Sequence, residues 1–207
     1  MKNFKLKTHY KKILADTISP VSVYLKIRDQ FPNSILLESS DYHGNDNSFS
    51  YICCNPIASI KVEAKLITKT YPDHTTETKT VEPNKVTLEI DTFTKQFKTK
   101  NDKVFKFINN GMFGFTAYDA VKYFEDITIS KKEDSIEIPD IYYAVYQNII
   151  AINHFKNEAV IFAHCYERES NIEIINHLIK KQSFSSYDFK SKGEIISNLT
   201  DKAFKSN

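Results

Sequence analysis

Tryptophan is absent from the 207-residue sequence, glycine occurs only four times, and there are only three cysteines, two of them adjacent. The four glycines fit neither the phosphate-binding pattern G-x-x-x-x-G-K-[ST] nor the dinucleotide pattern G-x-G-x-x-G. Three cysteines do not make a disulfide framework, which is typical of a reducing compartment. No apolar run of about 18 residues is present, and the first residues lack a signal-peptide apolar region. We therefore expect a cytoplasmic protein without a membrane span.

Arginine is also scarce, since only Arg28 and Arg168 occur. Base readout and bidentate phosphate contacts rely on arginine, and 28 basic against 26 acidic residues give a net charge of only +2. We therefore expect no nucleic-acid partner. Five lysines do fall within residues 2–12. We interpret this stretch as a solvated, frayed terminus, the alternative being an anion-binding arm.

The residues that are present indicate a globular fold. Hydrophobic residues make up 41% of the chain and charged residues 26%, close to ordinary soluble values. Apolar spacing predicts helices over 20–31, 86–97 and 169–181, with a helical turn over 118–125. Strands are predicted over 34–39, 49–54, 57–64, 66–71, 76–81, 112–117, 141–153 and 159–165. The expected fold class is α+β, with a largely antiparallel sheet or sandwich and a few flanking helices.

Cysteine and histidine do not form a recognisable reactive pattern. Cys53 and Cys54 are neighbours on a predicted strand, so their side chains point to opposite faces and cannot converge on one metal ion. The same holds for the pair His164 and Cys165. The six histidines show no metal-ligand spacing, although His43 lies in a predicted loop, as does His74. We expect buried structural cysteines, no metal site and no catalytic residue in this chain.

Glu38 is the acidic residue with the most informative position. It ends a short apolar strand and is followed directly by Ser39. A carboxylate at such a place has to be paired or solvated. It can therefore receive the ammonium of a ligand or form ordinary hydrogen bonds at the strand end, and the spacing leaves both alternatives open.

Three segments in order resemble a known family. These are DTISPVSVYLKIRD (16–29) followed by ILLES (35–39), then Ser50–Ile52 with Asn55 and Pro56, and finally GMFGFTAYDAVKYFE (111–125). Over about residues 14–165 the series resembles the amino-terminal half of anthranilate synthase component I. The pattern departs from the family at Ser48, at Cys53 and at Asn153-His154, where the family often has arginine, glycine and Asp-His.

The resemblance implies a reaction and a division of the protein. The family adds an amino group from ammonia to chorismate and eliminates pyruvate to give anthranilate for tryptophan biosynthesis, and a glutamine amidotransferase subunit supplies the ammonia. By this resemblance, residues 1–182 are the amino-terminal regulatory domain, and residues 183–207 are a linker toward the missing catalytic half. That half holds chorismate and Mg²⁺ in the family. We therefore expect no synthase activity from these 207 residues alone.

The resemblance also places part of an L-tryptophan feedback site on this chain. It implies that Glu38 accepts from the ligand ammonium, that Ser39 bonds its polar head or holds the loop, and that Phe49 or Ser50 walls the pocket. Leu37 belongs to the same segment. Two alternatives remain: a fragment of aminodeoxychorismate synthase component I, from the folate pathway, and a free-standing α+β binding module.

Overall fold

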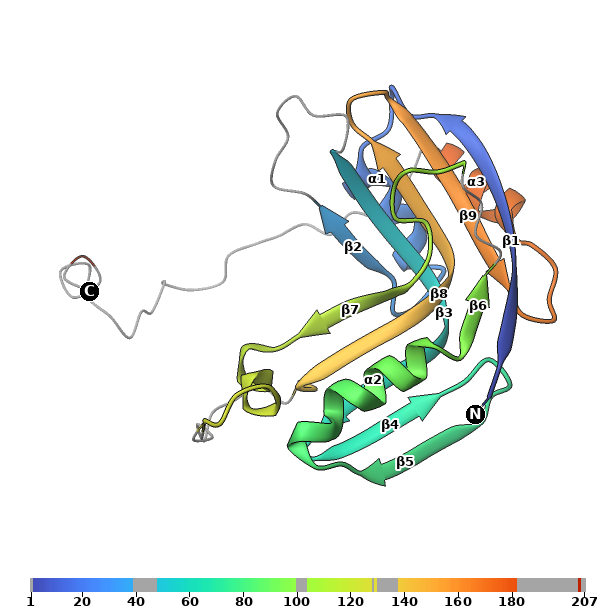
Figure 1. The fold of residues 1–207 in the computed structure, drawn as a ribbon. Coiled ribbons are helices and arrows are strands. Elements are labelled where there is room, and N and C mark those ends of the chain that lie inside the picture. Colours follow the sequence, from blue (N-terminus) through green and yellow to red (C-terminus); the bar gives the residue numbers. More distant parts are fainter. Residues whose placement is uncertain are drawn as a thin grey trace.

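A nine-stranded sheet organises the computed structural model, which describes residues 2–38, 48–99, 104–127, 129, 138–181 and 205 (Figure 1). The strands are β1 (Phe4–Leu14), β2 (Ile35–Glu38), β3 (Phe49–Glu63), β4 (Leu66–Thr70), β5 (Thr76–Thr80), β6 (Phe97–Thr99), β7 (Met112–Thr116), β8 (Ile141–Asn153) and β9 (Glu158–Cys165). Their order is β5-β4-β3-β8-β9-β1-β6, with β2 beside β3 and β7 beside β8. All pairs are antiparallel except β1 with β6.

Short helices pack against this sheet. They are α1 (Pro20–Arg28), α2 (Val86–Thr94) and α3 (Ile172–Lys180), with 3-10 turns η1 (Pro83–Lys85) and η2 (Tyr118–Tyr123). The predicted α+β class with a largely antiparallel sheet is confirmed. All three helices are shorter than the expected 20–31, 86–97 and 169–181. Most of the predicted linker, along with Ser39 and His43, lies outside the described residues.

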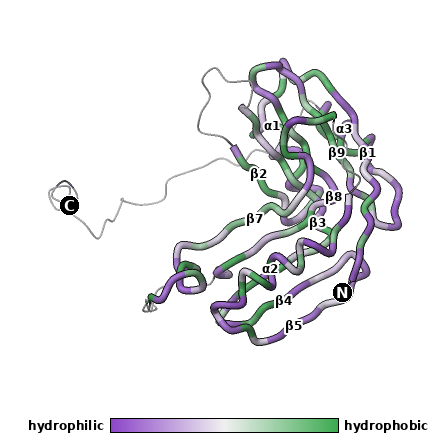
Figure 2. The backbone as a smooth tube through the Cα atoms, viewed as in Figure 1, coloured by the Kyte–Doolittle hydropathy of each residue, from purple (hydrophilic) through white to green (hydrophobic). Residues whose placement is uncertain are grey.

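Local signals account for α1 and for the β4–β5 hairpin. Ser19 caps α1 by accepting from the backbone N–H of Ser22 at 3.2 Å, and Pro20 takes the first helical position, where no N–H is needed. β5 is exposed along its whole length, and Figure 2 accordingly colours it white and purple. The predicted hairpin is confirmed, and β4 alternates between buried and more exposed positions, whereas β5 is exposed on both faces.

β3 is one strand of 15 residues, and the expectation of two strands over 49–54 and 57–64 is wrong. Its register against β8 shifts between Pro56 and Ala58. Asn55 adopts a φ of 59°, the left-handed conformation that asparagine tolerates better than most residues. The pattern Asn-Pro therefore marks a β-bulge, which bends a strand without ending it.

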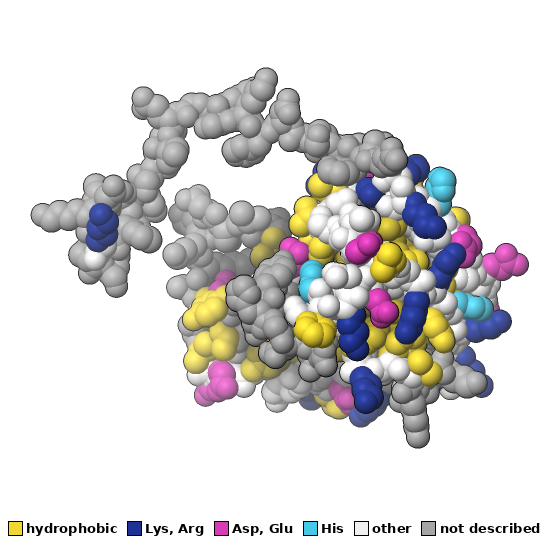
Figure 3. Space-filling model, turned by 90° about the horizontal axis from the view of Figure 1, so that it is seen from above, with side chains coloured by type: hydrophobic (Ala, Val, Ile, Leu, Met, Phe, Trp, Pro, Cys, Tyr) yellow, Lys and Arg dark blue, Asp and Glu magenta, His cyan; other side chains and the backbone are white. Residues whose placement is uncertain are grey.

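The lysine-rich start of the chain is strand β1, and its interpretation as a frayed terminus is wrong. Phe4 and Leu6 are buried, whereas Lys5 and Lys7 between and after them are exposed. β1 pairs with β9 over eight residues, from Lys7–Cys165 to Leu14–Glu158. Seen from above, basic side chains are interspersed with acidic and hydrophobic ones (Figure 3). The alternation, and not the lysine count, decides the structure here.

The three cysteines are buried and free, as predicted. Cys53 and Cys54 belong to hydrophobic clusters on opposite faces of the sheet, which agrees with strand alternation. Burial raises the pKa of Cys54 to about 12 and also raises the pKa of Cys53, where the neighbouring thiol adds to the effect. These thiols stay protonated near neutral pH and act as small apolar groups.

His164 on β9 joins three segments. Its Nδ1 lies 2.9 Å from Oγ1 of Thr8 on β1, and its Nε2 lies 2.8 Å from the carbonyl oxygen of Asn109. A carbonyl only accepts, so Nε2 carries the hydrogen and the Thr8 hydroxyl donates to Nδ1. Burial lowers the pKa of His164 below its usual 6.5.

Acid should therefore weaken the fold through His164. The unfolded chain binds this proton more readily, so the free energy of unfolding should fall as the pH drops below about 6.5, down to the lowered folded-state pKa. Urea denaturation at a series of pH values checks this. His164→Gln should flatten the pH dependence, and the exposed His177→Gln should leave it unchanged. An unaltered pH dependence in His164→Gln would show that another group is responsible.

Candidate ligand site at the end of strands β2 and β3

The predicted ligand residues lie where β2 ends and β3 begins. Glu38 is paired directly with Ser50 across the two strands, and Leu37 is paired with Tyr51. Directly opposed residues share a face of an antiparallel sheet, and consecutive residues alternate between faces. Glu38 and Ser50 therefore lie on one face, whereas Leu37 and Phe49 lie on the other.

The face that carries Glu38 and Ser50 is covered by α1 and α3. Along it, Leu36 and Ile52 pack with buried side chains of those helices, such as Val23. Ser50 is fully buried and its Oγ lies 2.7 Å from Nε2 of His154. Glu38 itself is exposed. The site thus combines an accessible carboxylate with a fixed hydroxyl on the strand beside it.

His154 is a site residue that the sequence analysis did not select. It follows β8, where the register pairs Asn153 with Phe49. The backbone N–H of His154 donates to the carbonyl oxygen of Ser48 at 3.1 Å, which places the His154 backbone beside the start of β3. In the sequence, His154 is 104 residues from Ser50. Only the pairing of β3 with β8 could have revealed this contact.

The opposite face, which carries Leu37 and Phe49, is aromatic. The Phe49 ring stacks on Phe107 with centroids 4.7 Å apart and on Tyr51 at 6.0 Å. Phe105 and Phe162 extend the same cluster. Phe49 therefore packs among aromatic rings and does not face Glu38. The sheet separates the four described candidates into two pairs, Glu38 with Ser50 and Leu37 with Phe49.

The third resembling segment, 111–125, forms β7 and η2. Tyr123 donates from its hydroxyl to Asp140 at 2.6 Å, and Lys122 contacts the other carboxylate oxygen at 2.7 Å. Asp119 lies in the first turn of η2 and does not cap it, because Ala117 holds the cap position without a side-chain bond. Tyr118 is 89% exposed. Asp140 thus holds η2 through Lys122 and Tyr123, whereas the Tyr118 ring faces solvent.

Comparison with known proteins places these features in a family. The family model described as chorismate binding enzyme matches residues 33–207. This chain belongs to the chorismate binding enzyme family. The resemblance inferred from its three segments is thereby confirmed at the level of the family.

Curated relatives of this chain carry a more specific name. Anthranilate synthase component 1 from Lactococcus lactis subsp. lactis is 27% identical, and the match covers 94% of this chain and 42% of that protein. The protein of the same name from Aquifex aeolicus is 25% identical, covering 97% and 40%. A solved structure of anthranilate synthase component I from Streptococcus pneumoniae TIGR4 matches with 23% identity and a TM-score of 0.41, covering 81% of this chain and 35% of that one. The chain thus spans about two fifths of the length of these curated relatives.

The described residues also bear on metal binding and on membrane crossing. No group of three or more His, Cys, Asp or Glu side chains lies together so as to hold a metal ion among the described residues. The described residues thus do not fit the Mg²⁺ that the family resemblance implies. None of the described helices is both long and apolar enough to cross a bilayer.

Proposed function

We propose that the protein containing this chain is a cytoplasmic anthranilate synthase component I. It converts chorismate and ammonia to anthranilate and pyruvate, in tryptophan biosynthesis, and a glutamine amidotransferase subunit delivers the ammonia. The support is the family match over residues 33–207 together with the names of the relatives, which align with 94% and 97% of the chain.

In this proposal, residues 1–182 form the regulatory part and residues 183–207 lead toward the catalytic part. The residues that hold chorismate and Mg²⁺ then lie in sequence beyond this chain, which covers about two fifths of its relatives. The 207-residue chain alone is expected to make no anthranilate.

The role of this chain in the proposal is to sense L-tryptophan. The observation that carries it is the exposed Glu38 carboxylate opposite the buried Ser50, whose hydroxyl is held by His154. A carboxylate accepts strong hydrogen bonds from an α-ammonium group. The ammonium of L-tryptophan therefore binds at Glu38, with Ser50 as the polar wall on the same face and Ser39 toward the ligand's polar head.

Leu37 and Phe49 have a different role from Glu38 in this proposal. Leu37 and Phe49 lie across the sheet from Glu38, so they reach the same ligand only beyond the end of β2. Phe49 packs in the aromatic cluster with Phe107 and holds the strand end in place, and Leu37 lies on the same face of the sheet. We assign them to supporting the site and assign Glu38 to recognising the ligand.

The complete reading frame that encodes this chain provides the test of the proposed reaction. Its protein product, supplied with chorismate, ammonia and Mg²⁺, should generate anthranilate, which is detected by its fluorescence and by chromatography. The 207-residue chain serves as the negative control. Formation of an aminodeoxychorismate in place of anthranilate would assign the protein to the folate-pathway enzyme. Failure to consume chorismate would contradict the proposal and favour a binding module.

A further inference from the structure

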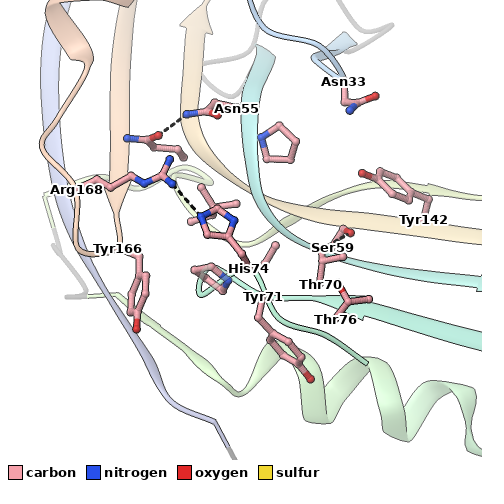
Figure 4. Close-up of a pocket in the computed structure, with 15 residues that line it drawn as sticks. Asn33, Asn55, Ser59, Thr70, Tyr71, His74, Thr76, Tyr142, Tyr166 and Arg168 are labelled. Atoms are coloured by element: carbon pink, nitrogen blue, oxygen red, sulfur yellow. Dashed lines mark hydrogen bonds between the residues drawn. The ribbon is translucent and has the colours of Figure 1, made fainter. Parts of the chain in front are cut away.

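A cleft of about 370 Å³ with several polar lining residues lies at the other end of β2 from Glu38 (Figure 4). Three separate parts of the fold meet there: the bulge of β3, the β4–β5 turn and the segment that follows β9. They contribute Asn55, His74 and Arg168, respectively, and Asn33 and Tyr142 line the cleft too. A cleft of this size suits a small molecule, since ligand sites typically measure about 300–1,000 Å³.

Arg168 and His74 are joined in the cleft. Nη2 of Arg168 lies 3.0 Å from Nε2 of His74. A guanidinium only donates, so Nε2 of His74 accepts, and the ring of the neutral histidine keeps its proton on Nδ1. Among the described residues, Arg168 makes no ion pair with a carboxylate. The pair thus offers further N–H donors and a positive charge that forms no salt bridge with a carboxylate of the described residues.

The acidic residue nearest to His74 in the sequence is engaged elsewhere. Oδ1 of Asp73 accepts from the backbone N–H of Thr75 at 3.0 Å and from its hydroxyl at 2.6 Å. Oδ2 of Asp73 lies 3.3 Å from Nζ of Lys2 on the chain segment before β1. These contacts fix the turn that carries His74 and occupy the carboxylate. The Asp73 carboxylate is therefore engaged with Thr75 and Lys2 and forms no salt bridge with the Arg168 guanidinium.

Amide groups complete the cleft from the sheet. Nδ2 of Asn55 donates to Oε1 of Gln147 on β8, and Nε2 of Gln147 contacts Sγ of Cys165 at the end of β9. The backbone carbonyl oxygen of Asn33, just before β2, accepts from the Tyr146 hydroxyl at 3.2 Å. Asn55 is thus held by its contact to β8, and its Nδ2 carries a second hydrogen that can donate to a ligand.

The backbone is bent at each element that supplies the cleft. Four non-glycine residues around it have positive φ angles: 61° at Asn33, 59° at Asn55, 63° at His74 and 49° at Glu167. Such conformations are uncommon for residues other than glycine and persist where surrounding contacts enforce them. Asn55 and His74 themselves line the cleft, and Glu167 directly precedes the lining residue Arg168.

We propose that this cleft binds a small organic carboxylate. Its described lining residues include an arginine and a histidine but no aspartate or glutamate. A guanidinium matches the two oxygens of a carboxylate in a planar, bidentate arrangement. Arg168 takes the carboxylate, while the Nδ1–H of His74 and the Asn55 amide donate to further oxygens of the ligand. The proposal is independent of the anthranilate reaction and of the site at Glu38.

Calorimetric titration of the 207-residue chain with malate, at constant ionic strength, tests the proposal. Malate supplies two carboxylates and a hydroxyl, and sulfate and inorganic phosphate serve as tetrahedral comparison anions. We expect saturable binding of malate with one site. Arg168→Gln should weaken it by about tenfold or more, because it removes a charged hydrogen-bond donor. His74→Gln should weaken it several-fold.

Arg28→Gln is the matched control, because it removes the only other arginine from the end of α1 and makes the same change in net charge. It should change malate affinity less than about twofold. Equal effects of the two arginine variants would overturn the proposal, as would the absence of saturable malate binding. Tighter binding of sulfate or phosphate than of malate would overturn the carboxylate assignment. Circular dichroism confirms that each variant is folded before it is titrated.

Discussion

Gly114→Ala is expected to cost roughly 4 kcal/mol of unfolding free energy, in the range reserved for severe backbone conflicts. A Cβ built on Gly114 would lie 1.9 Å from the carbonyl oxygen of Tyr142 and 2.8 Å from Cα of Tyr143. Both are backbone atoms of β8, and Gly114 is paired with Tyr143 in the ladder. The contact can be relieved only if β7 separates from β8.

Urea denaturation of Gly114→Ala measures this cost. Gly111→Ala provides the comparison, because nothing lies within 4 Å of its Cβ and only its φ of 124° is unfavourable for alanine. That variant should lose only about 1 kcal/mol. If both variants were equally stable, β7 would not pack on β8 as closely as described. Because β7 leads directly into η2, Gly114→Ala should also release the Tyr118–Tyr123 turn.

Glu89→Gln is expected to be the second most damaging change, at roughly 3 kcal/mol, because it leaves a buried lysine without a counter-charge. Nζ of Lys69 is 2.6 Å from the Glu89 carboxylate, and the Lys69 side chain is only 6% exposed. Lys79 contacts the other oxygen at 2.9 Å. Burial works to raise the pKa of Glu89, but hydrogen bonds and charge from the two lysines hold it below its usual value. This contribution to stability is therefore present above the unfolded-state pKa and lost as the pH falls through the lowered folded-state pKa.

Two variants show whether the buried pair explains the loss. Glu82→Gln breaks the exposed pair between Glu82 and Lys85, which are 2.7 Å apart, and should have no measurable effect on thermal or urea unfolding. Combining Lys69→Met with Glu89→Leu should recover most of the stability, since apolar side chains can replace a buried ion pair. A double variant no better than Glu89→Gln would mean that the loss arises from packing of α2 and not from the uncompensated charge.

The sequence predicts the parts of the fold that rest on local signals. Ser19 with Pro20 defines the start of α1, and alternating threonines define the β4–β5 hairpin. Lysine content misleads at β1, because the buried positions alternate with exposed lysines and the partner strand β9 begins more than 140 residues later. Asn55-Pro56 predicts a turn that separates two strands, but it forms a bulge within one strand, because β3 pairs with β8 on both sides of it.

The candidate site was predictable only in part for the same reason. The resemblance selects Glu38 and Ser50, and the structure pairs them directly. The contact between Ser50 and His154 depends on the pairing of β3 with β8, and no spacing within the sequence reveals it. His74 and Arg168, which are 94 residues apart, meet for an equally non-local reason. Strand alternation decides which residues share a face, and it becomes informative only once the register is known.

Inhibition of anthranilate formation by L-tryptophan tests the central claim most directly. It is measured on the protein from the complete reading frame, as wild type and as Glu38→Gln, with Glu158→Gln as a second exposed strand-end glutamate for control. Our account predicts that Glu38→Gln raises the half-inhibitory concentration of tryptophan about tenfold or more, since a charged hydrogen bond is lost. The kcat and the KM for chorismate should stay unchanged, and Glu158→Gln should respond like wild type. Undiminished inhibition of Glu38→Gln by tryptophan would contradict the account.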